Sequence, residues 1–402
     1  MQTHLSFDEA VKVIRSQKTS PGFELISLDE ALGRVLAIDV YACRNIPSFK
    51  KSPFDGYALR SMDCPGTLKY AGTVYAGIEE LKDIQEGECV KIFTGAPLPP
   101  SADVVIKSED ALFEEGILTV LKKAPPLTNV IMPGEDIEEG QLLIRIGTRL
   151  NASHLGVLAG QGLDRVMVYS KPRACIIPTG SELAEPGEEC SPFGIYNSSS
   201  YVLSAYLREM GFDVDRTDIV PDEAEEVKAA VERVLSLGYD AVFTTGGASI
   251  GDKDYALETA KSLGADILFW KVSVKPGGAL LVSKAEGKAL ISLSGNPAAA
   301  IMSILVVLRA WLFAMTGRED PAKELELPLK DDMPKSAHAV RLLRGRLFLE
   351  DGKAYFSENQ GRGNGNIASF DNCDLIGIIP GGTGPLKKGD VIKVLSLSRE
   401  II

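Results

Sequence analysis

The sequence predicts a multidomain α/β plus β protein. Its central α/β domain has a parallel sheet and is joined to an N-terminal helical linker region, a β-rich inserted domain and a C-terminal small β domain. Apolar strands alternate with amphipathic helices over 172–317, whereas short β-branched runs broken by Gly and Pro fill 41–140, and this β texture returns after 317. A chain of 402 residues is also too long for a single compact core. We place the four domains at 1–40 plus 141–170, 41–140, 171–323 and 324–402.

Two helices are predicted near the N-terminus from paired serine and glutamate residues. Ser6 stands three residues before Glu9, and Ser27 stands three residues before Glu30, which is the spacing of a capping box. We therefore expect a helix after each serine, the second one ending near Leu36. A further helix is expected at 152–158.

The region 172–317 gives the strongest pattern for secondary structure. Its strands and helices alternate, which favours right-handed βαβ crossovers and a parallel sheet. In such sheets ligands bind beyond the carboxyl ends of the strands, where this sequence has glycine-containing turns. In order, the expected elements are a strand at 174–177, a helix at 198–210 ended by Gly211, a strand at 214–220, a helix at 222–237 and a strand at 240–245.

The mostly apolar segment 298–315 raises the question of a membrane span. Arg309 stands in its middle, and Asn296-Pro297 begins it as a helix cap followed by proline in the first turn. Its length is at the lower limit for crossing a bilayer. We interpret the segment as a buried helix and expect no membrane partner.

Composition narrows the function classes. Lys and Arg number 43 against 55 Asp and Glu, so the net charge of −12 counts against a nucleic-acid partner. The three histidines are too scattered for a His-x-x-x-His zinc pair. Six cysteines without a Cys-x-x-Cys pair, and an N-terminus without a signal pattern, favour reduced thiols in a cytoplasmic protein.

Four segments place carboxylates beside glycine turns or sheet edges: 52–58, 94–99 with Asp103 and Glu109 downstream, 179–183 and 245–254. Taken singly, each is compatible with an ordinary turn. Glycine-rich turns after buried strands can also hold an anion at a helix N-terminus, and converging carboxylates suit Mg²⁺. Lys275 is compatible with a solvated turn residue or a phosphate contact.

Taken in order, the motifs resemble those of the MoeA family, the molybdopterin molybdenumtransferases, which is also related to the E domain of gephyrin. The match is collinear from about residue 6 to the C-terminal β domain. The motifs are Glu-Ala-Leu-Gly-Arg-Val-Leu-Ala at 30–37, Asp-Gly-Tyr-Ala at 55–58, Thr-Gly-Ala-Pro-Leu-Pro at 94–99, Gly-Glu-Asp-Ile at 134–137, Thr-Gly-x-Glu-Leu at 179–183, Gly-Gly-x-Ser-x-Gly-x-x-Asp at 246–254, Lys-Pro-Gly at 275–277 and Gly-Asn-Pro at 295–297.

The resemblance implies an elongated homodimer of four subdomains, with an α/β domain of the molybdopterin-binding type, similar to molybdopterin adenylyltransferase, the expected upstream partner. It implies an enzyme of molybdenum cofactor biosynthesis that takes adenylylated molybdopterin and molybdate. Such an enzyme cleaves the adenylyl group with Mg²⁺, releases AMP and leaves molybdenum on the dithiolene. It also implies that the Asp55 module completes the partner subunit's α/β site.

The resemblance also assigns site residues. Because the substrates are anions, carboxylates are better suited to binding Mg²⁺ or positioning water, whereas hydroxyl groups, lysine and backbone amides suit the substrates. The residues with catalytic and metal-binding roles are Asp55, Glu182, Asp222 and Asp254. The substrate-binding residues are Thr94, Gly246, Gly247, Ser249, Lys275, Ser294, Asn296 and Pro297.

Two departures from the family pattern remove basic side chains. The family's Lys-Pro-Gly-Lys-Pro is Lys-Pro-Gly-Gly-Ala at 275–279, and the basic residue before Gly134 is missing at 131–133. These losses motivate an alternative, a non-catalytic carrier or scaffold that binds molybdopterin or the finished cofactor. A second alternative is an insertase that prefers tungstate, an oxyanion of nearly the same size and charge.

Overall fold

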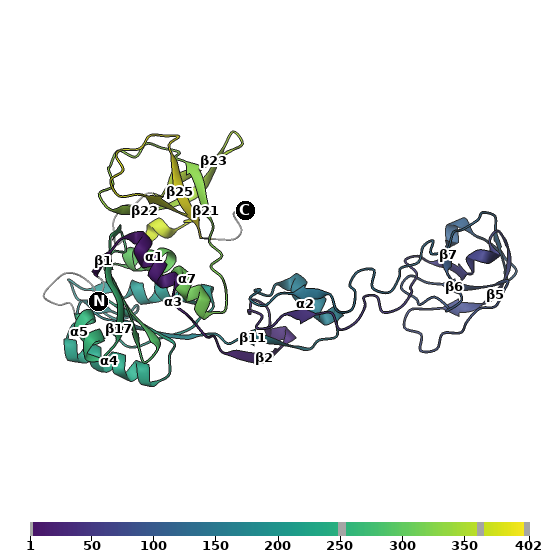
Figure 1. Ribbon diagram of the computed structural model, residues 1–402, viewed down its shortest axis with the longest axis horizontal. Helices are drawn as coiled ribbons and strands as arrows, with labels where there is room; N and C mark the ends of the chain where they lie inside the picture. Colours follow the sequence, from purple (N-terminus) through teal and green to yellow (C-terminus); the bar gives the residue numbers. More distant parts are fainter. Residues whose placement is uncertain (1–2, 248–254, 360–365, 398–402) are drawn as a thin grey trace. The chain divides into compact units, whose positions relative to one another are not determined.

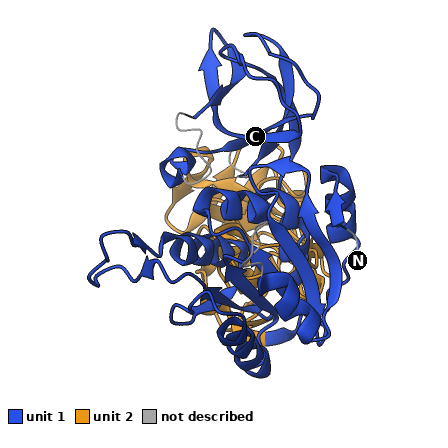
Figure 2. Cartoon of the chain, turned by 90° about the vertical axis from the view of Figure 1, so that its left-hand side faces the viewer, with its two compact units in different colours: residues 1–24, 167–402 blue, residues 25–166 orange. Residues whose placement is uncertain are grey.

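The computed structural model describes residues 3–247, 255–359 and 366–397. The chain divides into two compact units, the first formed by 1–24 with 167–402 and the second by 25–166 (Figure 2). It passes from one unit to the other within β2 (Phe23–Ser27) and within β11 (Arg165–Tyr169). Each unit has its own sheets and its own hydrophobic core.

A seven-stranded sheet forms the centre of the first unit, with strand order β1-β17-β19-β20-β16-β12-β15. β12 is parallel to β15 and β16, and β16 is parallel to β20, so the predicted parallel sheet is confirmed. β19 is antiparallel to both β17 and β20, which therefore run in the same direction. The strands are β1 (Thr3–Leu5), β12 (Arg173–Pro178), β15 (Asp213–Arg216), β16 (Ala241–Thr245), β17 (Asp266–Val272), β19 (Leu280–Ala285) and β20 (Lys288–Leu293).

Helices cover both faces of this sheet (Figure 1). One face packs against α1 (Phe7–Arg15), α3 (Ser198–Met210) and the helix that continues through α6 (Pro297–Met302), the π-helical segment η4 (Ser303–Leu308) and α7 (Arg309–Met315). The other packs against α4 (Ala224–Ser236) and α5 (Tyr255–Ser262). α1 has the predicted capping box, in which the Glu9 amide donates to Ser6 Oγ at 3.3 Å.

The apolar helix at Pro297–Met315 belongs to the core of the first unit. In the described part of the chain it is the one helix long and apolar enough to cross a membrane, and 83% of its apolar window is buried. Arg309, which is 4% exposed, pairs through Nε with Asp320 Oδ1 at 2.5 Å. The helix therefore packs as the buried helix that the sequence predicts.

A second sheet in the first unit contains the C-terminal strands, in the order β18-β22-β24-β25-β21, with β23 also paired to β22. Its core includes Phe356, whose ring lies where side chains at Gly345 and Gly377 would otherwise stand. The strands are β18 (Val274–Lys275), β21 (Glu324–Pro328), β22 (Val340–Glu350), β23 (Lys353–Glu358), β24 (Leu375–Ile379) and β25 (Val391–Ser396), with a 3-10 turn η5 (Ile367–Phe370). A small pair, β13 (Leu183–Ala184) with β14 (Ile195–Tyr196), completes this unit.

The second unit is built around a six-stranded sheet with strand order β7-β4-β6-β5-β9-β8 and an apolar cluster on each face. Its strands are β4 (Gly56–Leu59), β5 (Gly66–Val74), β6 (Glu88–Ile92), β7 (Val104–Lys107), β8 (Leu112–Glu114) and β9 (Ile117–Val120). The remaining elements are β3 (Val40–Tyr41) paired with β10 (Leu142–Ile144), helix α2 (Ala152–Gly160), and the 3-10 turns η1 (Leu28–Glu30), η2 (Ser61–Asp63) and η3 (Ser108–Asp110).

The predicted helix from Ser27 to Leu36 is wrong. Its capping box forms, but the helix ends after the single turn η1. Gly33 has a φ of +77°, which takes the backbone out of the helix, and its amide donates to Leu150 O at 2.8 Å. The capping box depends on neighbouring residues only, whereas the backbone after η1 is held by a hydrogen bond to Leu150, more than a hundred residues away in the sequence.

Candidate functional site

Four turns meet at the carboxyl edge of the seven-stranded sheet, after β12, β15, β16 and β20. The Gly180 amide, beyond β12, donates to Val220 O at 3.1 Å, beyond β15. The Gly246 amide, beyond β16, donates to Leu293 O at 3.0 Å, at the end of β20. The parallel strands thus bring together glycine turns that are widely separated in the sequence.

Gly246 is required by close packing at this edge. Its φ is +110°, and a Cβ atom there would lie 2.5 Å from Thr179 Oγ1 and 3.0 Å from Thr179 O. Thr179 Oγ1 is itself fixed, because it donates to Thr245 O at 2.8 Å. The edge therefore has backbone and no side chain at position 246, where a ligand can approach main-chain groups closely.

Two of the predicted carboxylates lie in neighbouring turns. Glu182 is exposed, and its Oε2 lies 2.9 Å from the position that a Cβ atom would take on Gly180. Asp222 is half-buried, and its amide donates to Ser181 Oγ at 3.3 Å. Ser181 thus links the turn of Glu182 to the turn of Asp222.

Of the other two predicted acidic ligands, Asp55 belongs to the second unit, whereas Asp254 lies outside the described residues, as does Ser249. Within the ranges that the structure describes, no group of three or more His, Cys, Asp or Glu residues is arranged to hold a metal ion. Glu182 and Asp222 therefore offer carboxylate oxygens of the kind that Mg²⁺ prefers, but they do not form a complete protein cage.

Two helices begin at the same edge. Pro297 is the first residue of α6, and the Asn296 amide donates to Ser294 Oγ at 3.2 Å. Ser199, in the first turn of α3, donates from Oγ to Gly295 O at 3.3 Å. Helix N-termini carry unpaired amides and partial positive charge, so this edge suits anionic ligands.

Gly247 completes the turn after β16 and lies against α5. Its φ is +68°, and a Cβ atom there would lie 3.6 Å from the Ala256 amide nitrogen. Gly246, Gly247, Ser294, Asn296 and Pro297 are thus gathered at one edge, in the arrangement the sequence suggested for the substrate-binding turns.

Lys275 also follows the carboxyl end of a strand, but it is part of a separate pocket. It lies just beyond β17, which runs in the same direction as β20, and it pairs with Arg341 across β18 and β22. The next turn packs where α6 continues into η4, since Ser303 Oγ donates to Gly277 O at 3.1 Å. The motif therefore borders the same sheet edge.

The pocket at Lys275 has a volume of about 400 Å³ and is mainly cationic. Arg341 Nη2 lies 3.9 Å from Glu358 Oε1, and burial lowers the pKa of the Arg344 guanidinium. Sequence reasoning missed this group, although the closely spaced basic residues at 335–346 are a signal that could have found it. Its charged lining residues are Lys275, Lys335, Arg341, Arg344 and Glu358.

Asp55 and Thr94 meet within the second unit. The Asp55 carboxylate Oδ1 accepts hydrogen bonds from the Thr94 amide and from Thr94 Oγ1, each at 2.8 Å. Both hydrogen bonds lower the pKa of Asp55 below its ordinary value, and the bond from the backbone amide has the larger effect. The carboxyl group is ionised at neutral pH. The Thr94 hydroxyl proton is used in this bond, which fixes the orientation of the Asp55 carboxylate.

The glycine after Asp55 is fixed by sheet packing. A Cβ atom on Gly56 would lie 2.1 Å from Ile106 O on the neighbouring strand β7. Lys107 Nζ lies 4.0 Å from the centroid of the exposed Phe54 ring. Asp55 is thus held at the start of β4 with positive charge nearby.

Comparison with known proteins identifies the family. Three parts of the sequence match, in order, families described as MoeA N-terminal region (domain I and II) over 5–162, probable molybdopterin binding domain over 175–314 and MoeA C-terminal region (domain IV) over 326–397. A molybdopterin molybdenumtransferase of Staphylococcus epidermidis is 33% identical, over 98% of this chain and 96% of its own length. The chain belongs to the MoeA family.

Other MoeA proteins agree with this assignment. A molybdopterin molybdenumtransferase of Staphylococcus aureus is 30% identical, over 96% of this chain and 94% of its own. A crystal structure of a molybdopterin biosynthesis MoeA protein from Pyrococcus horikoshii has a TM-score of 0.87 at 29% identity, covering 98% of this chain and 99% of that one. The predicted MoeA family, fold class, transferase class and role in molybdenum cofactor biosynthesis are therefore confirmed, and the carrier alternative is not favoured.

Proposed function

We propose that this MoeA protein inserts molybdenum from molybdate into adenylylated molybdopterin, with Mg²⁺-dependent hydrolysis of the adenylyl phosphoanhydride and release of AMP. The observation that carries the proposal is the carboxyl edge of the sheet, where glycine turns, two helix N-termini and two carboxylates meet. Such an edge suits a substrate with phosphate groups and a cation between them.

The anionic substrates are bound by groups that donate hydrogen bonds. Gly246 and Gly247 place no side chain over the main chain of their turn, so a phosphate group can approach the backbone there closely. Helix α6, which follows Asn296 and begins at Pro297, offers the unpaired amides of its first turn. Ser294 and Ser249 supply hydroxyl groups. These residues hold the phosphate groups of the adenylylated substrate, which carboxylates would repel.

The carboxylates act on the metal side of the reaction. Asp55, Glu182, Asp222 and Asp254 bind Mg²⁺ directly or through its water molecules and orient the attacking water. When bound, Mg²⁺ would neutralise charge on the phosphate oxygens as the phosphoanhydride breaks. The support for Asp55 is geometric, because two hydrogen bonds from Thr94 hold its carboxylate in one orientation.

The cationic pocket beside Lys275 binds molybdate. Lysine and arginine donors suit a small tetrahedral dianion, and the pocket borders the edge where the phosphate groups lie. We expect Lys275→Met to raise the KM for molybdate by about tenfold, the effect of losing about 1.4 kcal/mol of binding. Lys387→Met, at an exposed lysine of the same unit, is the matched control and should leave KM unchanged. An unaltered KM in Lys275→Met would refute this assignment.

The assembly and location follow the family expectation. We propose a cytoplasmic homodimer that receives its substrate from a molybdopterin adenylyltransferase. All six cysteines lie in the described ranges and are free thiols, which supports a reducing compartment. The dimer is tested by mass in solution. If Asp55 serves the partner subunit's site, mixing inactive Asp55→Asn with inactive Glu182→Gln should restore part of the activity, because one site of each mixed dimer is intact.

The central test supplies adenylylated molybdopterin, molybdate and Mg²⁺ and follows AMP release. Asp254→Asn should abolish the release while leaving the fold intact, because only a charge is removed. Asp351→Asn is a matched control at an exposed turn position with a φ of +49°, which asparagine tolerates. Absence of molybdate-dependent AMP release from the folded wild-type protein would refute the function, and full activity in Asp254→Asn would refute the role of that residue.

A further inference from the structure

We propose that a second cavity of the first unit, at the amino-terminal edge of its sheet, binds a small anion that carries phosphate. The cavity has a volume of about 500 Å³, which is within the range of small-molecule sites. Every residue that lines it belongs to the first unit. Nothing in the proposed reaction uses it.

The cavity is separated from the reaction edge by the length of the strands. Asp240 immediately precedes β16 and Lys288 begins β20, whereas Gly246 and Ser294 follow the other ends of these strands. Five or six residues of strand correspond to about 16–20 Å. Lys284, near the end of the antiparallel strand β19, is at the same edge as Lys288 because it pairs with Ala289.

Positive charge dominates the lining. Four lysines, Lys18, Lys171, Lys284 and Lys288, face one carboxylate, that of Asp240. Asp240 is already engaged, since its Oδ2 accepts the Arg173 amide at 2.7 Å. The concentration of lysines is notable in a chain whose net charge is −12.

Not all four lysines are equally available to a ligand. Lys288 Nζ donates to Leu235 O at 2.6 Å and lies 3.9 Å from Glu286, and Lys171 Nζ lies 3.9 Å from Asp213. Within the described part of the chain, neither Lys18 nor Lys284 forms an ion pair with a carboxylate. These two ammonium groups are therefore the primary contacts for an anion.

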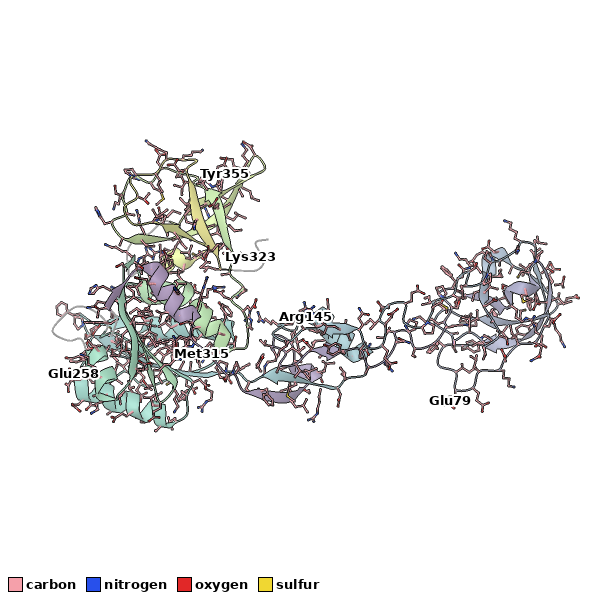
Figure 3. The ribbon with its side chains drawn as sticks, in the orientation of Figure 1. Glu79, Arg145, Glu258, Met315, Lys323 and Tyr355 are labelled. Atoms are coloured by element: carbon pink, nitrogen blue, oxygen red, sulfur yellow. The ribbon has the colours of Figure 1, made fainter. Side chains whose placement is uncertain are left out.

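The remaining wall has an apolar part, and Thr19, Ser20 and Ser170 add hydroxyl groups to it. Trp311, which is 3% exposed, and Met315, labelled in Figure 3 at the end of α7, line the cavity. Lys284 Nζ lies 5.4 Å from the centroid of the Trp311 ring. An ammonium group beside an apolar wall fits a phosphate group, with room for an organic part next to it.

Trp311 provides a local probe of binding. The sequence has two tryptophans, so in a Trp270→Phe background the fluorescence comes from Trp311 alone. The replacement is mild, because the buried Trp270 Nε1 has no hydrogen-bond partner among the residues that the structure describes. Inorganic pyrophosphate and AMP are titrated separately at constant ionic strength, with chloride replacing the anion, because salt screens exposed charges.

We expect a saturable change in Trp311 fluorescence. Lys284→Ala should weaken binding by about tenfold, Lys284→Arg should retain most of it, and Lys261→Ala, at an exposed lysine of α5, should have no effect. Equal affinities for pyrophosphate and AMP would identify the bare phosphate group as the ligand, and tighter binding of AMP would identify a nucleotide. Calorimetry on the chain with both tryptophans repeats the measurement if Trp270→Phe does not fold.

Two results would overturn the proposal. One is the absence of a saturable change in Trp311 fluorescence with either anion, since calorimetry with AMP also reports binding at the proposed reaction edge. The other is equal binding by Lys284→Ala and Lys261→Ala, which would locate the anion elsewhere on the protein. Neither result depends on AMP release, so the proposed function is tested separately.

Discussion

Replacing Gly246 by alanine tests whether close backbone packing organises the reaction edge. The added Cβ atom would lie 2.5 Å from Thr179 Oγ1, a distance that requires atoms to move. Thr179 cannot yield freely, because the same oxygen donates to Thr245 O inside the sheet. The change therefore strains residue 246 and disturbs the neighbouring turn.

The expected loss of stability has two parts. A non-glycine residue held at a φ of +110° costs about 1–3 kcal/mol. Losing the hydrogen bond from Thr179 costs a further 0.5–1.5 kcal/mol, so the sum is about 1.5–4.5 kcal/mol. A folded domain with a typical stability of about 5–15 kcal/mol withstands this loss.

The assay combines denaturant unfolding with molybdate-dependent AMP release. Gly264→Ala is the matched control, since Gly264 has a φ of +64° but nothing within 4 Å of its added Cβ atom. It should lose about 1–2 kcal/mol and keep its activity. Gly246→Ala should lose more stability, and its activity should fall by up to about a hundredfold if the turn moves by about 1 Å. Equal stability of the two variants, with normal activity in Gly246→Ala, would refute the packing argument.

Three further predictions concern single contacts. Asp320→Ala should lower the free energy of unfolding by about 3 kcal/mol, measured with denaturant, because it removes the carboxylate that pairs with the buried Arg309. A loss below about 1 kcal/mol would contradict this prediction. Thr94→Val should raise the pKa of Asp55 towards 3.8, measured by carboxyl NMR, although the backbone donor remains. Because folding lowers the pKa of Asp55 in the wild type, its hydrogen bonds stabilise the folded protein above the unfolded pKa. This stabilisation is lost as the pH falls through the folded pKa. Cys89 should resist thiol reagents at pH 8 until the protein unfolds, since burial raises its pKa to about 12, and rapid labelling of the folded protein would argue against that burial.

Sequence patterns predicted the central sheet well because its signals are local and repeat. Buried strands followed by glycine turns recur through the α/β region. The helix predicted at 222–237 is α4, and the apolar residues spaced along one face of it, Val227, Val231, Val234 and Leu235, are buried. The glycine at the end of α3 is likewise in the left-handed conformation that ends the helix, with a φ of +108° at Gly211. Parallel pairing then brings the turns to one edge.

The contacts within the site could not be predicted in the same way, because they depend on strand register. Asp55 and Thr94 are 39 residues apart, and they meet because Gly56 pairs with Ile92 across β4 and β6. A shift of one residue would turn the side chains to the other face. The motifs identified both residues, but only the pairing shows that Thr94 orients Asp55.

Lys275 illustrates a second limit. Its place after a strand suggested a ligand edge, but its neighbours come from a sheet more than sixty residues further along the chain. Arg341 reaches it through the pairing of β18 with β22. The sequence could not assign this neighbour, because two-residue strands such as β18 give almost no periodic signal.

This long-range pairing bears on the charge of the protein. A chain with a net charge of −12 repels anionic substrates at a distance, and the family's second lysine is absent at Gly278. The cationic side chains of 335–344 stand beside Lys275 in one pocket, so attraction for an anion is produced locally by the C-terminal sheet. Salt screens the attraction between a bound anion and side chains in contact with it less than it screens attraction over more than a Debye length, which is about 8 Å at physiological ionic strength. Molybdate binding through the buried Arg344 and the half-buried Arg341 should therefore depend only weakly on salt. A steep fall in affinity between low and physiological salt would show that exposed lysines, Lys275 and Lys335 included, are responsible.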